Sequence, residues 1–330
     1  MKCLVTGATG FVGTNLVHEL VEAGWKVRAT GLHGDTKHIA HLPIEIKMAD
    51  ITIPEEVNEI VKGCDIVFHM AGDTSFWKHY FDRQRRVNVN GTVNIAKACL
   101  QNGVKKMVYT STIDVLGYDP AGEAITEETG KFNFDNMGYN YGETKLKALE
   151  KIHNFIQQGL DTVIIYPGFM MGPYDHTLQL GRLFFDMKNG KLPFLIPGGS
   201  SFCHVTEVAK AHIVASEQGQ TGEGYICAGN SHTNIPHAIL WQKMADAINV
   251  KPPKTTIPRM IFILYAYMCQ ITSELTKKPP QIDPGQARQM TCHQYALSSK
   301  AVKDLGYHIP DIDTCIEDAL VWYRNNGYDL

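Results

Sequence analysis

A glycine-spaced turn near the N-terminus constrains the fold of this chain more than any other feature. Met1–Val5 is a short apolar run, Phe11–Ala23 places apolar residues at helical spacing, and Trp25–Thr30 again has the character of a strand. Gly24 follows the helical segment, where a left-handed residue commonly ends a helix. Strand, helix and strand within the first thirty residues predict a βαβ unit, and therefore a parallel sheet.

Three glycines join the first strand to the first helix. Gly7, Gly10 and Gly13 stand in a GxxGxxG pattern. Gly7 and Gly10 allow a tight turn with positive φ, Gly10 also lets a pyrophosphate approach the backbone, and Gly13 lets the helix pack closely on the sheet. Free N–H groups at the start of the helix favour an anion there. Because the trio lies inside a βαβ unit, it predicts a dinucleotide-binding site.

The alternation of strands and helices continues to about residue 168. Further strands are predicted at Ile44–Met48, Asp65–Met70, Lys105–Thr110 and Thr162–Tyr166. Helices are predicted at Pro54–Lys62, Asn90–Gln101 and Tyr139–Gln157. Several strands are continuously apolar, as strands buried on both faces are. The predicted fold class is therefore α/β, with a doubly wound parallel Rossmann sheet of six strands.

The C-terminal half has a different pattern. Residues 172–201 are rich in Gly and Pro, and the later helices do not alternate with clear strands. These helices are predicted at Ile235–Asn249, Pro258–Ser273 and Asp313–Asn326. We therefore expect a dinucleotide-binding Rossmann domain at 1–168 and a smaller substrate-binding lobe at 169–330, with some segments of the second part returning to the first.

Composition excludes several other classes of protein. The chain carries 31 Lys and Arg against 34 Asp and Glu without a cluster of five basic residues, so nucleic acid is not an expected partner. The eight cysteines form no CxxC pair, which favours free thiols in the cytoplasm. The longest uncharged apolar run, Met260–Cys269, is about half of the ~20 residues that a membrane-spanning helix needs. We expect a cytoplasmic protein with no signal peptide, integral membrane segment or metal site.

An ordered set of motifs resembles the extended short-chain dehydrogenase/reductase family. The segment 6–13 reads TGATGFVG, which is similar to the cofactor loop of that family. The other matching segments occur in the family's order, at 50–51, 69–72, 88–92, 109–112, 141–145 and 166–168. The resemblance covers nearly the whole chain and is of the NAD-dependent epimerase/dehydratase type, dihydroflavonol 4-reductase-like. It implies NADP or NAD as cofactor and a small-molecule substrate.

The resemblance also implies which residues contact the cofactor. They lie at the glycine loop, at the carboxyl ends of later strands and on the helix that begins near residue 139. The implied contacts are Gly7, Thr9, Gly10, Phe11, Val12, Gly13, Asp50, Ile51, Ala71, Gly72, Asn88, Thr110, Tyr141, Lys145, Tyr166, Pro167 and Gly168. Asp50 and Ile51 would flank the adenine, and Ala71 and Gly72 would pass beneath the cofactor.

The end of the second strand bears on the choice between NADP and NAD. A carboxylate there would bind the ribose 2′-OH of NAD and repel the 2′-phosphate of NADP. After Thr30 no carboxylate appears until Asp35. Arg28 and His33 are nearby bases that could meet the phosphate, although Leu32 stands where related reductases carry an Arg. NADP is therefore favoured, and NAD stays open.

Tyr141 and Lys145 are four residues apart on a predicted helix, so their side chains share one face. An ammonium near a phenol stabilises the phenolate and lowers its pKa from about 10. By resemblance, Tyr141 is the acid/base that exchanges a proton with the substrate oxygen, and Lys145 also holds the nicotinamide ribose. Tyr139 points elsewhere on the helix and is the weaker candidate.

Hydroxyl side chains end the fifth strand. The resemblance places Thr112 against the substrate oxygen, with Ser111 as the alternative if the register differs by one, because neighbouring strand residues face opposite sides. In sugar 4,6-dehydratases of the family, the Thr is followed by an Asp and a Glu, whereas this chain has Ile113 and Asp114. Elimination chemistry is therefore not expected. Asp114 is either a substrate-facing carboxylate or a hydrogen-bonded structural residue.

Aromatic and thioether side chains are candidates for the wall of a dry substrate pocket. The predicted substrate residues are Trp77, Met170, Phe202, His204 and Asp114, with Phe76, Phe169, Met171 and Tyr174 as further candidates for the wall. His204 could equally pack between the lobes. The apolar stretch 257–271 could dock on a membrane, as in hydroxysteroid relatives, although its helical spacing is more typical of a core or a cap.

Together these features predict an NAD(P)-dependent oxidoreductase that interconverts a carbonyl and an alcohol by hydride transfer. The alternatives are a sugar or nucleotide-sugar epimerase with a tightly bound, recycled cofactor, and a non-catalytic sensor of the nicotinamide ratio. The basic residues of the C-terminal half are scattered and form no clear diphosphate clamp. Extended family members commonly dimerise through two helices, so a homodimer through Asn90–Gln101 and Tyr139–Gln157 is a hypothesis.

Overall fold

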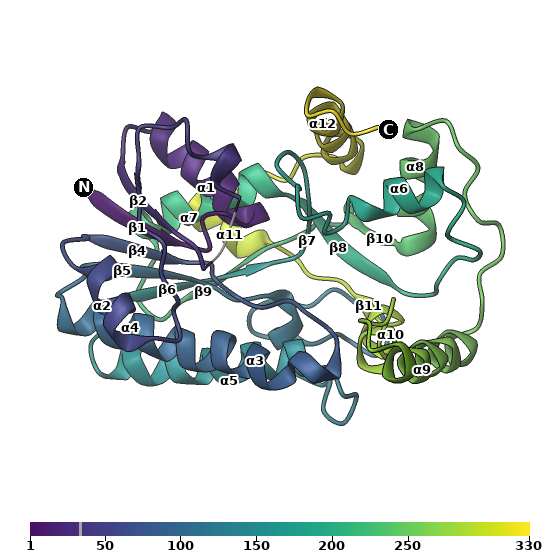
Figure 1. Ribbon diagram of the computed structural model, residues 1–330, viewed down its shortest axis with the longest axis horizontal. Helices are drawn as coiled ribbons and strands as arrows, with labels where there is room; N and C mark the ends of the chain where they lie inside the picture. Colours follow the sequence, from purple (N-terminus) through teal and green to yellow (C-terminus); the bar gives the residue numbers. More distant parts are fainter. Residues whose placement is uncertain (33–34) are drawn as a thin grey trace.

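The computed structural model describes residues 1–32 and 35–330, which form two lobes lying side by side (Figure 1). The larger lobe is built on a parallel sheet with the strand order β3-β2-β1-β4-β5-β6-β9. Its strands are β1 Lys2–Thr6, β2 Lys26–Thr30, β3 Glu45–Ile46, β4 Ile66–His69, β5 Lys106–Thr110, β6 Thr162–Pro167 and β9 Gly224–Cys227. The predicted doubly wound Rossmann sheet is confirmed.

Helices cover both faces of this sheet (Figure 1). On one face lie α1 (Phe11–Glu22), α7 (Val205–Gln218) and α11 (Ser299–Leu305). On the other face lie α2 (Pro54–Val61), α4 (Thr92–Gln101) and α5 (Asn140–Gln157). Because both faces are covered, a central strand such as β4 is buried at every position, which explains its continuous apolar sequence.

The larger lobe differs from the prediction in three places. β9 comes from the C-terminal half and pairs with β6, so the sheet has seven strands rather than six. β3 is shorter than the predicted Ile44–Met48, because it pairs with β2 only through Glu45 and Ile46. The helix predicted from Asn90 is preceded by α3 (Phe81–Arg85) and a π-helical turn (Arg86–Gly91) before α4 begins.

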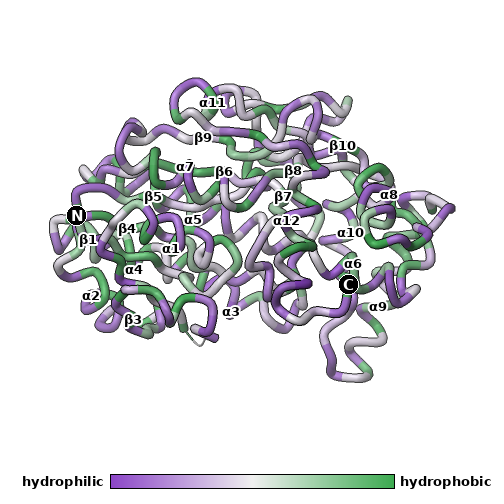
Figure 2. Tube along the Cα trace, turned by 90° about the horizontal axis from the view of Figure 1, so that it is seen from above, coloured by the Kyte–Doolittle hydropathy of each residue, from purple (hydrophilic) through white to green (hydrophobic). Residues whose placement is uncertain are grey.

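The smaller lobe has its own sheet and its own core. β8 (Gly199–His204) pairs with β7 (Phe169–Met171), β10 (Asn234–Pro236) and β11 (His293–Gln294). The helices are α6 (Arg182–Lys188), α8 (His237–Ala247), α9 (Arg259–Thr276), α10 (Pro284–Met290) and α12 (Ile312–Asn325). Seen from above, α8 and α9 lie at the end of the molecule opposite the N-terminus (Figure 2).

The chain crosses between the lobes several times after residue 168. Three elements of the C-terminal half, α7, β9 and α11, pack in the larger lobe. In the sequence, α7 and β9 lie between β8 and β10 of the smaller lobe, and α11 lies between β11 and α12. Among the described residues, no helix combines the length and the apolar character needed to cross a membrane. The eight cysteines, all of them within the described ranges, form no disulfide.

Candidate active site

The glycine loop connects β1 to α1 in a shape that only residues without a side chain allow. Gly7 has a φ of +68°, and a Cβ on it would lie 2.9 Å from the backbone of Ala71. A Cβ on Gly13 would overlap the carbonyl of Gly7. No side chain caps the start of α1, so the N–H groups of its first turn face the loop without a side-chain partner. This cradle of bare backbone at a helix N-terminus fits the pyrophosphate of a dinucleotide.

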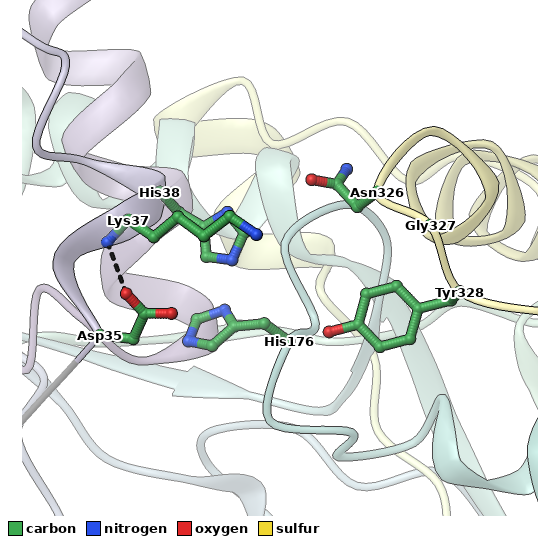
Figure 3. Close-up of a pocket in the computed structure, with 7 residues that line it drawn as sticks. All are labelled: Asp35, Lys37, His38, His176, Asn326, Gly327 and Tyr328. Atoms are coloured by element: carbon green, nitrogen blue, oxygen red, sulfur yellow. Dashed lines mark hydrogen bonds between the residues drawn. The ribbon is translucent and has the colours of Figure 1, made fainter.

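A hollow of about 470 Å³ borders the glycine loop (Figure 3). Its lining comes from the segment after β2, from the loop after β7 and from the end of α12. The lining residues are Asp35, Lys37, His38, His176, Asn326, Gly327 and Tyr328. His176 also hydrogen-bonds the carbonyl of Thr9 through Nε2 at 3.0 Å, which places the hollow next to the tip of the loop. None of the predicted cofactor residues lines it, and it is separate from Tyr141.

The structure corrects the prediction for Arg28. The Arg28 side chain is buried, and its Nη1 donates hydrogen bonds to the carbonyls of Ile60 and Lys62 at 2.6 and 2.9 Å. Its Nε forms an ion pair with Glu45 at 3.0 Å. Arg28 therefore holds the C-terminal end of α2 against the sheet and is not available to a cofactor phosphate. The other predicted base, His33, lies outside the described residues.

The implied contacts near the adenine and beneath the cofactor are held by specific local bonds. Asp50 Oδ1 accepts hydrogen bonds from the backbone N–H and the hydroxyl of Thr52, and Ile51 is buried against Gly91. Asn88 Oδ1 accepts from the Asp73 N–H at 2.7 Å, and its Nδ2 donates to the Asp73 carbonyl. These bonds fix the loop after β4, which contains Ala71 and Gly72.

The implied contacts at the ends of β5 and β6 face several directions. The Thr110 hydroxyl pairs with His212 Nε2 of α7 at 2.8 Å, so only its carbonyl lies toward α5. Tyr166 is buried in the core between the sheet and α5. Gly168, which follows Pro167, allows a close crossing, because a Cβ there would lie 2.6 Å from the Ser201 carbonyl.

Tyr141 and Lys145 lie in the first turns of α5, beside the end of β5. Lys145 is buried, and its Nζ donates a hydrogen bond to the carbonyl of Thr110 at 2.7 Å. The same ammonium lies 4.7 Å from the ring centre of Tyr109. Gly142 allows this packing, because a Cβ there would meet the ring of Tyr139 at 2.8 Å. The helix therefore places both side chains on the face that borders the end of the strand, as their spacing predicts.

Burial changes the acidity of both groups. The pKa of Lys145 is lowered to about 7, mainly because burial disfavours the ammonium. The pKa of Tyr141 is raised, mainly by burial and next by the charge of Asp114, while a hydrogen bond with Thr112 acts in the opposite direction. The predicted lowering of the Tyr141 pKa by Lys145 is therefore not seen: burial and Asp114 raise this pKa, and Thr112 is the group that acts against them. Tyr141 keeps its proton at neutral pH, as an acid must.

Thr112, rather than Ser111, is the hydroxyl on the Tyr141 side. The Thr112 hydroxyl is close enough to the Tyr141 phenol to affect its pKa, and it caps the short 3-10 helix Ile113–Leu116. Ser111 is buried, its N–H bonds the Ile165 carbonyl at 2.8 Å, and its hydroxyl has no partner among the described residues. This placement supports the register in which Thr112 meets the substrate oxygen.

Asp114 lies behind Thr112 and is fully hydrogen-bonded. Its Oδ2 accepts from the hydroxyls of Thr112 and Tyr139 at 2.9 and 3.1 Å. Its Oδ1 accepts from Gln294 and Gln289 at 3.0 and 3.4 Å. Of the two interpretations of Asp114, the structure agrees with the hydrogen-bonded residue and not with a carboxylate that faces the substrate. Burial raises its pKa, although these donors stabilise the charged form.

Three of the predicted substrate residues have contacts within the protein. His204 caps α7 by accepting a hydrogen bond from the Thr206 N–H, and its Nε2 pairs with Asp318 at 3.0 Å. Phe202 is 1% exposed in the core of the smaller lobe, and Met170 packs against the core of the larger lobe. The predictions for His204 and Phe202 are corrected, because capping and packing account for their side chains, whereas the partly buried Met170 stays a prediction.

Tyr141 packs against an aromatic cluster of which the sequence predicted only Phe76 as a wall residue. Phe134, Tyr139 and Cys292 are its buried centre, and it also contains Phe76, Tyr118, Phe132, Met137 and Tyr141. The predicted Trp77 follows Phe76 directly, and its ring packs edge-on against Tyr80 at 5.0 Å. The run of aromatic residues at 132–141 was a visible signal, but nothing in it indicated that it would meet residue 292.

Comparisons with known proteins cover the residues of this site. A model of the NAD dependent epimerase/dehydratase family matches residues 3–228, which include the glycine loop, Thr112, Tyr141 and Lys145. The chain belongs to this family. The resemblance to extended short-chain dehydrogenases/reductases is thereby confirmed, together with the expected class of nicotinamide-dependent enzymes.

Two relatives of this family member and one solved structure align over most of its length. It is 28% identical to a putative dihydroflavonol 4-reductase of Synechocystis sp., over 98% of this chain and 95% of that protein. It is 30% identical to 3beta-hydroxysteroid-dehydrogenase/decarboxylase isoform 1 of Arabidopsis thaliana, over 92% of this chain and 75% of that protein. The crystal structure of gox2253 has a TM-score of 0.84 at 28% identity and covers 98% of both chains.

Proposed function

We propose that the protein is a reductase or dehydrogenase that interconverts a carbonyl and an alcohol with net turnover of NADP(H). The observation that carries this proposal is the convergence of Tyr141, Lys145 and Thr112 at the end of β5, next to the aromatic cluster. The similarity to a putative dihydroflavonol 4-reductase supports the same reaction class. Aromatic walls favour a largely apolar substrate and exclude water from the reacting atoms.

Tyr141 and Lys145 have different roles in the proposed reaction. A nicotinamide cofactor held along the glycine loop supplies or accepts the hydride. Tyr141, protonated at neutral pH, donates its proton to the substrate oxygen during reduction and takes it back during oxidation. Lys145 lies within one helical turn of Tyr141, where its charge stabilises the phenolate that remains after proton transfer.

The hydrogen bonds of Thr112 define how it can act. Its hydroxyl donates to Asp114 Oδ2 and accepts from the Asp114 N–H at 3.3 Å. Only an acceptor position therefore remains, and it can take a hydrogen bond from Tyr141 or from a substrate hydroxyl. Asp114 thus orients Thr112 toward the alcohol form of the substrate, while a carbonyl oxygen receives its proton from Tyr141.

A nucleotide-sugar epimerase is the second candidate, and the surroundings of Tyr141 favour it less. A diphosphate needs cationic side chains in bonding reach. Arg288, which lies beside the aromatic cluster, already donates to the carbonyl of Met137 at 2.7 Å and to the hydroxyl of Tyr267 at 2.5 Å. Two of the five N–H groups of its guanidinium are therefore taken by the protein, which leaves fewer for a diphosphate.

We propose NADP rather than NAD as the preferred cofactor. No carboxylate lies at 29–32, at the end of β2, and the hollow beside Thr9 is lined by Lys37 and His38 as well as by Asp35. Asp35, the first carboxylate after the strand, accepts a hydrogen bond from the Lys37 N–H at 2.9 Å. A kcat/KM more than about tenfold higher with NADH than with NADPH would contradict this preference.

We further propose a cytoplasmic homodimer whose protomers meet through α4 and α5. α5 carries Tyr141 and Lys145 on its inner face and exposes Lys147, Glu150 and Lys151 on its outer face. Light scattering at several concentrations tests the dimer, and fractionation of cells that express the full chain tests the location. A single species of monomer mass would remove the dimer.

Stoichiometry separates the two candidate functions. The purified protein is incubated with NADPH and a panel of aromatic and alicyclic ketones and aldehydes, and oxidised cofactor and alcohol are both counted. A reductase yields one alcohol for each NADPH consumed. Cofactor that co-purifies and is never consumed, together with interconversion of sugar epimers, would favour the epimerase.

A further inference from the structure

His176 joins the smaller lobe to the tip of the glycine loop. It belongs to the segment 172–181 that runs from β7 to α6, which we call the bridging loop. Its Nε2 lies 3.0 Å from the carbonyl oxygen of Thr9, and its Nδ1 lies 2.9 Å from the carbonyl oxygen of Tyr174. The side chain therefore ties the backbone of the bridging loop to the backbone of the glycine loop.

Both nitrogens of the His176 ring face oxygens that can only accept a hydrogen bond. A neutral imidazole has one N–H group and one bare nitrogen, whereas an imidazolium has two N–H groups. In a neutral ring, the lone pair of the bare nitrogen would face the lone pairs of a carbonyl oxygen, which is repulsive. The geometry therefore matches a protonated ring that donates to Thr9 and to Tyr174 at the same time.

The neighbours of His176 leave one position for a cation. The His38 ring lies 4.8 Å from the His176 ring, and the pKa of His38 is lowered mainly by burial and next by the charge of His176. His38 therefore favours its neutral form beside a charged His176. The other titratable groups around the ring are Asp175 next to it in the chain, Asp35 and Lys37 from the segment after β2, and Tyr328 after α12 (Figure 3).

The bridging loop is fixed on both sides of His176. The buried Asp175 accepts hydrogen bonds from two backbone N–H groups of the loop and, at 3.0 Å, from the hydroxyl of Tyr323 on α12. On the other side, Asn15 of α1 donates to the carbonyl of Pro173 at 2.9 Å. Because the loop is held in this way, His176 can fix the position of the glycine loop instead of following its movements.

Thr9 lies between Gly7 and Gly10, so the position of its peptide sets the shape of the cradle at the start of α1. A carbonyl oxygen of this loop that turned toward a bound pyrophosphate would repel it, and a hydrogen bond to that oxygen prevents the turn. We propose that His176, donating from both ring nitrogens, is a positioning residue that holds the Thr9 carbonyl and thereby shapes the cofactor cradle. The inference rests on the proposed function only in taking the glycine loop as the cofactor site.

The proposal predicts a pH dependence with a definite sign. A rise in pH through the range in which histidines titrate, about pH 5 to 8, removes one N–H group from His176. One of its two bonds is then lost, so cofactor affinity should fall as the pH rises. NADH is the probe for this effect, because it lacks the 2′-phosphate of NADPH, whose own ionisation near pH ~6 would change the affinity in the opposite direction.

Cofactor affinity is measured by fluorescence titration at pH 6 and pH 8.5 in the full chain. The wild type should bind NADH about tenfold more weakly at the higher pH. His176→Phe should bind weakly at both values, whereas His176→Arg, which keeps its charge and several N–H donors, should bind tightly at both. His232→Phe, which alters an exposed histidine, is the matched control and should behave as the wild type does. At a fixed pH, His176→Phe should weaken NADH and NADPH by the same factor, because both use the glycine loop.

The other outcomes separate the proposal from its alternatives. Wild-type affinity for NADH that is equal at the two pH values, or an equal fall in His176→Phe, overturns the proposal. A loss confined to NADPH would also overturn it and would place the ring against the 2′-phosphate. If His176→Phe does not fold, a pH-dependent affinity in His176→Arg overturns the proposal in its place. The expected affinities without turnover of any carbonyl would support the role of His176 and reject the proposed function.

Discussion

Helix α2 of the larger lobe and helix α9 of the smaller lobe bury their apolar residues differently. α2 buries Val57, Ile60 and Val61 and exposes the acidic residues of its first turn, so its polar side shows which side faces the core. α9 is apolar on its buried side, which includes Phe262, and also on its exposed side, which includes Leu264 and Met268. A polar face therefore shows which residues of a helix face the core. In a helix without a polar face, the sequence does not show which apolar residues are buried and which are exposed.

The largest expected effect lies in the glycine loop. Gly13→Val should weaken cofactor binding on the order of 10²-fold, because even a Cβ at Gly13 overlaps the backbone of Gly7 and the loop must open. Titration of cofactor fluorescence measures the change. Gly103→Ala is the matched control, since Gly103 also has a positive φ but no atom near its Cβ. It should cost about 1–2 kcal/mol of stability and leave cofactor binding intact. Unchanged affinity in Gly13→Val would remove the loop as the pyrophosphate site.

The two sides of α9 should respond very differently to truncation. Phe262→Ala removes a buried ring from the core of the smaller lobe and should lower the free energy of unfolding by about 3–5 kcal/mol. Leu264 lies two residues further along α9 and is exposed, so Leu264→Ala should change the free energy of unfolding by less than about 0.5 kcal/mol. Urea unfolding measures both. A similar decrease in the free energy of unfolding in the two variants would show that Leu264 packs against other residues of the chain.

A third effect concerns pH and the buried ammonium of Lys145. Burial lowers its pKa from 10.5 to about 7, so between these values the unfolded chain binds one proton more than the folded chain. Stability contributed by this group therefore rises with pH from about 7 to 10.5 and is constant below that window. Lys145→Met removes the group, so the stability difference between wild type and variant should change across this window. Parallel stability curves from pH 7 to 10 would contradict the shift.

The parts of the site that could be predicted depend on local spacing. Gly7, Gly10 and Gly13 form one turn, and Tyr141 and Lys145 share one helix face, so their geometry follows from their positions in the sequence. The positive φ predicted at Gly10 was wrong, because this residue is extended with a φ of −89° and only Gly7 is left-handed. Thr112 was identified through its place at the end of β5. The seven-stranded sheet was also largely visible, apart from β9, which is too short and too distant in sequence to be assigned to it.

The remaining parts depend on contacts between distant segments. Gln289 and Gln294 reach Asp114 from α10 and β11, and no pattern near residue 114 indicates them. Arg28 was assigned to the cofactor because the carbonyls of α2 that take its guanidinium could not be located from the sequence. His204 was assigned to the substrate for a similar reason, since its role as the cap of α7 depends on where that helix begins.

Turnover by Tyr141→Phe tests the central claim most directly. NADPH oxidation with the best carbonyl substrate is compared in the wild type, in Tyr141→Phe and in Tyr307→Phe, a control that removes another buried hydroxyl, which donates to the Ala228 carbonyl. If Tyr141 supplies the proton, its loss should lower kcat by ~10²-fold or more while cofactor affinity and the control activity stay close to those of the wild type. Wild-type turnover in Tyr141→Phe would contradict the proposed mechanism.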